Sequence, residues 1–369
     1  MKFDGKPSRD LGHRPFFSIV IACYNSRKTL GRLLDSVLAQ DKSVIDDIEV
    51  ILSDDCSTES YDDIVDQYKD KICIKRIQTD YNCCPGNTRE KGISIVEGEW
   101  LMICDHDDVL EPNSLHHVKN VIQKYNEELH VYTDFHEYWD RPGNKKDNFI
   151  RDMTELSGWN HGKFFNMDNL WRKYDIHFVK DMKTHEDIYI TAVVTAILKH
   201  LHKEPMHIKL FTYTWHKKAD SVSNTVYTYN GEPHAFLEVY FQDYSNSTAK
   251  VWKDQLKAGR LSKNYIFRTL SEILLYEYFY MQGFLFHEGK NFIKENIEVC
   301  RTDYNDLKEL CRCNREEIFG YLASYDARKY VEVFETAKIG TGPFIPVLTF
   351  EQWLKFLETD SLNPFANNI

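Results

Sequence analysis

The feature that most constrains the fold is a regular alternation of short apolar runs and helical periodicity over residues 17–104. Two runs rich in β-branched residues, 17–22 and 48–53, flank a segment in which leucine and valine recur at helical spacing. A second helical segment, an alternating run at 72–78 and a short apolar run at 100–104 continue the pattern. Strands that alternate with helices usually pair in parallel. We therefore predict an α/β fold with a Rossmann-like, mostly parallel central sheet and helices on both faces.

Polar clusters follow directly after three of these predicted strands, at residues 23–25, 54–55 and 105–108. The carboxyl ends of parallel strands meet at one edge of a sheet, and ligands of such sheets bind there. One such cluster alone could be a turn or a helix cap. Three of them predict a binding site at that edge.

The composition argues against some classes of partner. The 369-residue chain has a formal net charge of −11 and a sequence pI near 5.8, which does not suit a surface that attracts phosphate backbones or anionic lipid. Its nine cysteines are odd in number, and several lie in apolar runs where cysteine acts as a small hydrophobic residue. We predict a reduced, cytoplasmic protein for which nucleic acid is not the default partner.

No segment predicts secretion or a membrane span. The N-terminal residues lack the basic region, apolar core and cleavage site of a signal peptide. The longest apolar stretch begins at Leu270 and is interrupted by Glu272, Glu277 and Gln282, so we predict a buried helix there. A helix that binds a partner or a membrane surface is the alternative.

The chain divides by character into three parts. Residues 1–15 form a polar lead-in, and residues 16–228 contain the strand and helix alternation. Residues 229–369 are rich in aromatic and charged helical segments, with a turn at 340–343 before a final helix. We predict a catalytic domain at 16–228 and a helical C-terminal region at 229–369.

The acidic run after the strand at 100–104 suits a divalent cation. Mg²⁺ and Mn²⁺ are often held by only one or two carboxylates, which leaves coordination positions for phosphate oxygens. Asp105-His106-Asp107 offers such a pair. The spacing is short and common in acidic loops, so its weight comes from its position at a strand end opposite Asp54 and Asp55.

Five segments, taken together and in order, resemble the family 2 glycosyltransferases, which have the GT-A fold. They are FSIVIACYNS, VILSDDCST, GNTREKGISIVEGEW, LMICDHDDVLEPNSL and THEDIYI. The resemblance covers roughly residues 16–224. It implies inverting transfer of a sugar from a nucleotide diphosphate sugar, usually a UDP-sugar, with Mn²⁺ or Mg²⁺.

The resemblance also implies roles for residues at the strand ends. Those that would bind the donor are Ala22, Tyr24, Asn25, Asp54, Asp55, Arg89, Asp105 and Asp108. Within this set Asp55 would contact the polar edge of the base, and Asp105 would face the ribose or the donor sugar. Asp107 is the implied metal-binding carboxylate together with Asp105, while Asp108 would lie behind the metal or contact the sugar. His106 holds the variable middle position and is not expected to bind.

Two residues keep open alternatives. Arg89 lies in the segment that resembles the family's loop and helix next to the donor, so it would face the diphosphate; otherwise it is a surface arginine. His216, in YTWHKKADSVS, matches a histidine that reaches back toward the metal, and imidazole as a ligand favours Mn²⁺ over Mg²⁺. The alternative for His216 is a structural histidine.

The pair Glu186-Asp187 matches the acidic pair at the start of a helix in the family, which makes Asp187 the implied general base. A helix start stabilises a carboxylate, which weakens it as a base. Neighbouring Glu186 and the exclusion of water raise its pKa again. Without the resemblance, helix capping is the simpler interpretation.

Four positions depart from the family pattern, namely Ala22 for Pro, Cys56 for Gly, Glu90 for Asn and His185 for Gly. They bear on donor and acceptor identity more than on the reaction. A saccharide acceptor is our first prediction, because aromatics at 132–148 and 159–171 suit stacking on sugars. Transfer to a modified base in DNA, a non-catalytic nucleotide-sugar-binding module and a nucleotidyltransferase are the alternatives. Whether a partner protein binds is unknown.

Overall fold

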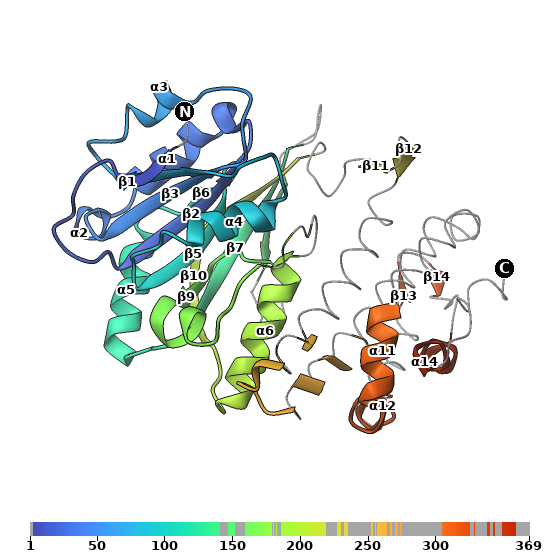
Figure 1. Ribbon diagram of the computed structural model, residues 1–369. Helices are drawn as coiled ribbons and strands as arrows, with labels where there is room; N and C mark the ends of the chain where they lie inside the picture. The colour runs from blue at the N-terminus through green and yellow to red at the C-terminus, as the bar shows by residue number, and fades with distance from the viewer. Residues whose placement is uncertain are drawn as a thin grey trace. The chain divides into compact units, whose positions relative to one another are not determined.

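We describe the protein from a computed structural model (Figure 1). It describes residues 3–140, 147–151, 159–178, 180, 182 and 186–218, and beyond these only short stretches between 227 and 358. The chain divides into two compact units, the first made of Met1–Val193 and Lys203–Asn224, the second of Val194–His202 and Thr225–Ile369.

The first unit is built on one ten-stranded sheet in the order β1-β4-β3-β2-β5-β9-β7-β10-β6, with β8 paired to β7. The strands that the first unit contributes are β1 Asp4–Pro7, β2 Phe17–Cys23, β3 Ile48–Asp54, β4 Cys73–Gln78, β5 Trp100–Asp105, β6 Val109–Leu110, β7 His130–Asp140, β8 Asp147–Arg151, β9 Lys163–Asn166 and β10 Met206–Lys218. Strands β4, β3, β2 and β5 all pair in parallel, as predicted. Strands β2, β3 and β5 are almost fully buried, which explains their near-continuous apolar sequence.

The far half of the sheet is mixed. Strand β9 is antiparallel to both β5 and β7, whereas β10 is parallel to β7 and antiparallel to β6. At the opposite edge, β1 lies within the polar lead-in and pairs antiparallel with β4. The GT-A fold expected from the resemblance is therefore present, a mostly parallel sheet with antiparallel additions.

Helices cover the two faces of the parallel strands (Figure 1). Those of the first unit are α1 Leu30–Leu38, α2 Lys42–Ile45, α3 Asp62–Val65, α4 Pro85–Ile93 and α5 Ser114–Tyr125, with a 3-10 turn η1 Ser26–Lys28 and a π-helical turn η2 Met167–Arg172; α6 Glu186–His200 begins in this unit. The apolar face of α1 and those of α2, α3 and α5 pack with Ile19, Ile21, Val50 and Leu52 in one core. Helix α4 lies on the other face, against Val20 and Ile51.

Helix α4 lies very close to the sheet because residue 92 is a glycine. A Cβ atom at Gly92 would lie 2.7 Å from Val20 Cγ1 and 3.2 Å from Ser53 Cβ. The Ser53 hydroxyl also donates a 2.6 Å hydrogen bond to the carbonyl oxygen of Thr88. Because α4 lies so close to the sheet, Arg89, which follows Thr88, is buried below the protein surface.

The second unit contains helices α11 Asn305–Cys313, α12 Arg315–Leu322 and α14 Phe350–Glu358 and two short hairpins, β11 Tyr227–Tyr229 with β12 Glu232–His234 and β13 Lys338–Ile339 with β14 Gly342–Pro343. In the apolar stretch predicted to be a buried helix, Leu270 and Leu274 are helical and fully buried. The rest of that stretch, including its three polar interruptions, lies outside the described residues.

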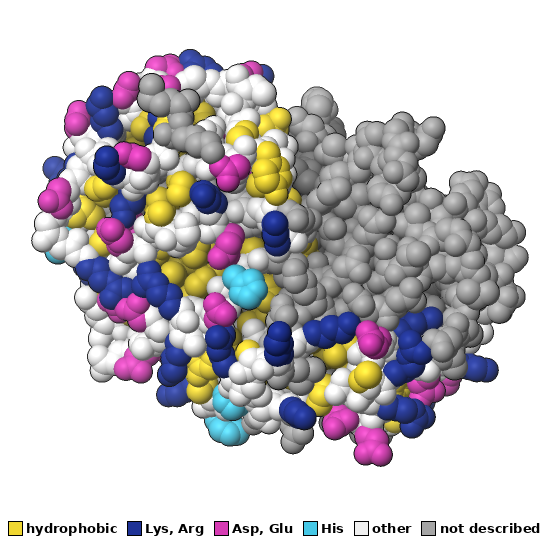
Figure 2. Space-filling model, viewed as in Figure 1, with side chains coloured by type: hydrophobic (Ala, Val, Ile, Leu, Met, Phe, Trp, Pro, Cys, Tyr) yellow, Lys and Arg dark blue, Asp and Glu magenta, His cyan; other side chains and the backbone are white. Residues whose placement is uncertain are grey.

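Across the part of the chain that the structure describes, every helix is too short or too polar to cross a membrane. On the face shown in Figure 2, acidic and basic side chains are interspersed over the described surface.

Candidate active site

The strand ends that carry the polar clusters lie side by side. In the parallel register, Ala22 near the end of β2 is opposite Ser53 on β3 and opposite Asp105 on β5. The segments that follow these three strands therefore leave the sheet at the same edge, as the alternation predicted.

The loop after β2 is tied to the loop after β3. Asn25 has left-handed backbone angles, φ 48° and ψ 40°. Its side-chain oxygen accepts hydrogen bonds from the backbone N–H of Thr58 at 2.9 Å and from the Thr58 hydroxyl at 3.0 Å. Neighbouring Tyr24 keeps 45% of its surface exposed, so an aromatic ring is available at the rim of the expected nucleotide pocket.

The two acids after β3 are buried and held by hydrogen bonds. Asp54 accepts from Ser57, Tyr61 and Gln78. Asp55 Oδ1 accepts from the Thr79 hydroxyl at 3.0 Å and from the backbone N–H of Cys83 at 2.8 Å. Asp55 is thus fixed in one orientation.

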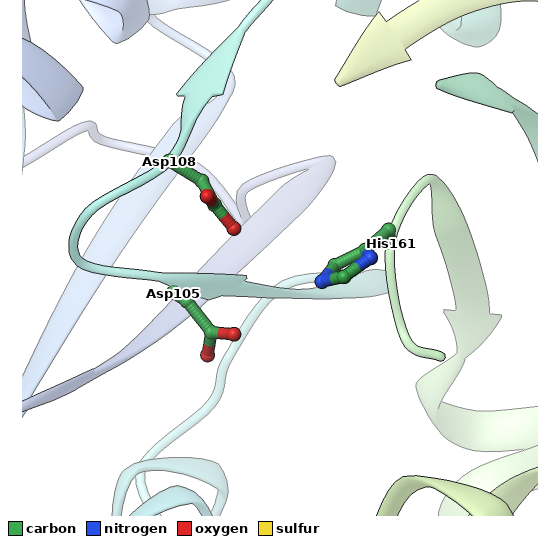
Figure 3. Close-up of side chains that lie close together, drawn as sticks. All are labelled: Asp105, Asp108 and His161. Atoms are coloured by element: carbon green, nitrogen blue, oxygen red, sulfur yellow. The ribbon is translucent and has the colours of Figure 1, made fainter. Parts of the chain in front are cut away.

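A turn rearranges the acidic run after β5. The backbone N–H of Asp108 donates to the carbonyl oxygen of Asp105 at 3.2 Å, which closes a four-residue turn. This turn brings the carboxyl group of the fourth residue of the run back over the strand end. Ligand atoms of Asp105, Asp108 and His161 lie within 4.8 Å of one another (Figure 3).

The group formed by Asp105, Asp108 and His161 differs from the expected metal site. Neither the side chain of Asp107 nor that of His216, both within the described residues, belongs to it. The carbonyl oxygen of Asp107 instead accepts a hydrogen bond from Arg32. His216 approaches through its backbone, since its N–H donates to Asp108 Oδ1 at 2.7 Å.

Asp108 and His161 are both deeply buried. Tyr213 donates its hydroxyl to Asp108 Oδ2 at 2.6 Å. Burial, followed by the charges of Asp105 and Asp107, raises the pKa of Asp108 well above its usual range. Burial lowers the pKa of His161 to about 4, so its imidazole is neutral at pH 7. The carboxyl groups of Asp105 and Asp108 and a neutral imidazole are donors that suit a divalent cation, whose charge would favour the ionised form of Asp108. The residues present therefore fit the metal that the family resemblance implies.

Arg89 is buried, so its interpretation as a surface arginine is wrong. Its guanidinium is 6% exposed and contacts three carboxylates from two elements. Nη2 donates to Asp105 Oδ1 at 2.6 Å, and Nη1 donates to Glu186 and, at 3.4 Å, to Asp187 Oδ1. Three acids around one cation leave an excess of negative charge in the site.

Asp187 lies at the start of α6, and its pKa is shifted from the ordinary value. Burial, followed by the charge of Glu186, raises its pKa to about 7, while Arg89 acts in the opposite direction. Its Oδ1 accepts a 2.7 Å hydrogen bond from the Asn160 side-chain amide. The charge of Glu186 acts in the expected direction, whereas the exclusion of water by bound substrates stays a prediction.

Sequence reasoning missed Asn160, His161 and Lys163 as site residues. All three are buried polar side chains in one short segment before and at the start of β9. Lys163 donates to the Thr191 hydroxyl at 2.8 Å, and burial lowers its pKa to about 7. The available signal was the cluster of polar residues in WNHGKFF, placed directly against an apolar run.

These features are those of the GT-A fold: a mostly parallel sheet with acids at its strand ends, and at a helix start an acidic pair of which Glu186 is buried and Asp187 partly buried. Residues 18–184 match the family model "Glycosyl transferase family 2". Over these residues the chain is similar to the family 2 glycosyltransferases.

Among curated proteins, the chain resembles the poly(ribitol-phosphate) beta-N-acetylglucosaminyltransferase TarS of Staphylococcus aureus, at 24% identity over 68% of this chain and 44% of TarS. It also resembles the succinoglycan biosynthesis protein ExoO of Rhizobium meliloti, at 35% identity over 27% of this chain and 28% of ExoO. The chain thus spans less than half the length of these relatives.

A solved structure shows the same fold. The crystal structure of S. aureus TarS 1–349 in complex with UDP-GlcNAc superimposes with a TM-score of 0.57 at 18% identity, over 88% of this chain and 95% of that chain.

Proposed function

We propose that this protein is an inverting glycosyltransferase that moves a sugar from a UDP-sugar to a hydroxyl group of a saccharide or glycoconjugate, with Mn²⁺ or Mg²⁺. The observation that carries the proposal is the position of Asp187. A carboxyl group with a pKa of about 7 binds the same guanidinium as Asp105, at the sheet edge where donors of this fold class bind. Base and donor site are therefore adjacent.

The donor proposal rests on the loops after β2 and β3. Asp55 is buried and oriented by Thr79 and Cys83 at Oδ1. Its Oδ2 accepts, among the described residues, only a long 3.4 Å bond from Asn82 and is the oxygen that would read the polar edge of uracil. Exposed Tyr24 and the ordered Asn25 loop would form the rest of the nucleotide pocket. The UDP-GlcNAc complex of TarS supports a UDP-sugar as the donor.

The metal would be held near Asp105, Asp108 and His161. When bound, Mn²⁺ or Mg²⁺ neutralises charge on the diphosphate as it leaves. Buried Arg89 adds a fixed positive charge on the same side of the site.

The base acts on the acceptor hydroxyl. Among the described residues, Arg89 and Asn160 both donate to Oδ1 of Asp187, so Oδ2 is the oxygen that would take the proton. The acceptor oxygen then bonds to the anomeric carbon from the face opposite the diphosphate, which leaves with the electron pair of the broken bond. The configuration at that carbon is inverted.

The acceptor side is lined by polar and aromatic groups. Asn160 Oδ1 is buried and lacks a hydrogen-bond partner in the described structure, so it can accept from a sugar hydroxyl. The partly buried rings of Trp159 and Trp215 lie 5.5 Å apart, and aromatic rings of this kind would line the acceptor side. The names of TarS and of a Bacillus spizizenii relative, poly(ribitol-phosphate) beta-glucosyltransferase, 38% identical over 27% of this chain, support a polymeric glycan-type acceptor.

A panel of nucleotide sugars tests the proposal. We expect UDP-sugars, and not GDP- or ADP-sugars, to be hydrolysed slowly and to raise the melting temperature, with both effects reduced by EDTA. Binding without hydrolysis or transfer would favour the alternative of a non-catalytic nucleotide-sugar-binding module. Retarded migration of DNA at low salt would favour transfer to a modified base. The proposed location is cytoplasmic, for which the cysteine usage argues.

A further inference from the structure

We propose that Asn160 is a positioning residue for the general base: its amide group holds one oxygen of Asp187, so that the other oxygen takes the acceptor proton. The inference rests on the proposed function, because it concerns how Asp187 works. Asn160 precedes β9 and Asp187 begins α6, so the contact joins two separate elements. Asn160 Nδ2 donates to Asp187 Oδ1 at 2.7 Å.

One oxygen of Asp187 is fully used by two donors. Arg89 Nη1 donates to the same Oδ1 at 3.4 Å, and a carboxylate oxygen has two lone pairs. The Arg89 guanidinium also binds Asp105 and Glu186, so the shorter bond from Asn160 is the one directed at Asp187 alone. A proton is therefore expected on Oδ2 of Asp187, whose side chain is 21% exposed.

A tight turn fixes the backbone from which the Asn160 side chain starts. The N–H of Lys163 donates to the carbonyl oxygen of Asn160 at 3.2 Å, which closes a four-residue turn. Gly162, the third residue of this turn, has φ +66°, and a Cβ there would lie 2.7 Å from the Thr133 hydroxyl oxygen. The Gly162 carbonyl oxygen accepts from the Thr133 N–H at 2.9 Å. The turn is thus held to β7 in one conformation.

The same turn holds α6 at a second point. Lys163 Nζ donates to the Thr191 hydroxyl at 2.8 Å. Thr191 lies four residues after Asp187, on the same face of the helix. Asn160, Lys163 and Thr191 are all buried. The turn therefore contacts the base-bearing helix in both of its first two turns.

A comparison with Asn166, at the end of β9, separates this role from an ordinary structural one. Both asparagines are buried. Asn166 Oδ1 accepts from the backbone N–H groups of Asp168 and Asn169, at 3.1 Å and 2.8 Å. Asn160 Oδ1 has no partner among the described residues, which is unfavourable for a buried acceptor. Asn160 thus serves the Asp187 carboxyl group rather than the local backbone.

Replacing Asn160 by Asp tests the amide donor. The variant keeps the size of the side chain but offers no N–H to Asp187. We expect calorimetry to show UDP affinity close to that of the parent. Hydrolysis of UDP-GlcNAc, or of the UDP-sugar that the nucleotide-sugar panel selects, should fall about 10- to 100-fold in kcat. Water takes the place of the acceptor hydroxyl in this assay.

Asn166→Asp is the matched control for this variant. It keeps the oxygen that Asn166 uses, so its kcat should stay close to that of the parent. Unchanged kcat in Asn160→Asp overturns the proposal. Loss of UDP binding in both Asn160→Asp and Asn160→Ala would make Asn160 a structural residue and would overturn it as well.

The pH profile of Asn160→Ala distinguishes positioning from general loosening. Ionised Asp187 loses a hydrogen bond, so the acidic limb of kcat/KM should move up by about one pH unit. Loosening would move it down, because burial is the main cause of the raised pKa of Asp187. The other charged groups that face this carboxyl group stay in place, namely Glu186, Arg89, Asp105 and Lys163. A limb that moves down or does not move overturns the proposal.

The positioning proposal and the function proposal fail in different ways. Hydrolysis and transfer by the parent protein test the function, and a parent without either activity would overturn both proposals. Normal turnover and an unshifted pH profile in the Asn160 variants, beside an inactive Asp187→Asn, would overturn the positioning role alone. The transferase would then stand, with its base held by Arg89.

Discussion

Asp105 and Asp187 accept hydrogen bonds from different terminal nitrogens of one guanidinium group, that of Arg89. The Nη2–Asp105 Oδ1 distance is 2.6 Å and the Nη1–Asp187 Oδ1 distance is 3.4 Å. The first residue ends a central strand and the second begins a helix much later in the chain. The donor side and the base side of the proposed site therefore share one buried cation.

Replacing Arg89 by Lys should separate these two sides. A lysine keeps the positive charge but is a single point that cannot bond in two fixed directions. We expect turnover to fall about 100-fold, the scale of a 1 Å misplacement of reacting groups. Steady-state kinetics measures this, with Lys91→Arg, an exposed position on the same helix, as the control. Unchanged turnover in Arg89→Lys would show that the shared cation does not position the base.

Replacing Asp187 by Asn should separate chemistry from binding. Asparagine keeps the shape and can still accept from Asn160, but it cannot take a proton. We expect donor affinity to stay close to that of the parent, while turnover falls about 10²–10⁴-fold. Titration calorimetry with UDP and a transfer assay measure the two quantities. Normal turnover would place the base elsewhere, with Glu186 next to test, and lost donor binding would make Asp187 a structural residue.

The pH profile should report the Asp187 carboxyl group. The base must be ionised, so kcat/KM should rise with pH through about 7, the pKa to which burial and Glu186 raise it. Because the charge of Glu186 contributes to this rise, Glu186→Gln should move the acidic limb to lower pH. A limb that stays in place in the Gln variant would assign the profile to another group.

The free energy of unfolding should depend on pH in the opposite direction: it should fall as pH rises, whereas kcat/KM rises. The pKa of Asp187 is raised from its ordinary value of 3.8 to about 7 in the folded state. The contribution of the Asp187 carboxyl group to the free energy of unfolding is then fully present below pH 4, and it is lost as pH rises through about 7. Urea unfolding without metal should show Asp187→Asn gaining stability relative to the parent between these pH values. A difference independent of pH would mean that the carboxyl group titrates normally.

The orientation of Asp55 predicts selectivity for uracil. Asp55→Asn keeps an oxygen for Thr79 and Cys83 but puts an amide donor where the second carboxylate oxygen stood. We expect UDP affinity to fall about tenfold or more, as hydrogen bonds to charged groups contribute about 1.5–3 kcal/mol. ADP and GDP binding, measured by calorimetry, should not change. Equal losses for every nucleotide would reduce Asp55 to a turn residue.

Much of the parallel half of the sheet was predictable from periodicity alone. Strands β2, β3 and β5 coincide with the predicted apolar runs, because a strand buried on both faces is mostly apolar, and β4 coincides with the predicted alternating run. Strands β7, β9 and β10 were not predicted in their pairing. Their direction depends on which neighbour covers each edge, and local sequence does not contain that information.

The same contrast holds in the site. Acids at strand ends could be predicted, since strand ends are visible in the sequence. The burial of Arg89 could not, because three carboxylates from distant segments make it favourable. The Asp108 carboxyl group lies beside Asp105 because of one turn hydrogen bond, and His161, which lies near both, comes from a segment without any periodic pattern.

The position of the Arg89 guanidinium depends on the glycine at position 92. The missing methyl group there sets how deeply α4 sits on β2 and β3, and thereby the height of the guanidinium one turn earlier. A bulkier residue at position 92 would push α4 away from the sheet. The Arg89 guanidinium would then move away from both Asp105 and Asp187. Variation at this uncharged, buried position would then be seen in the assay as an electrostatic defect, although no ionisable group had been touched.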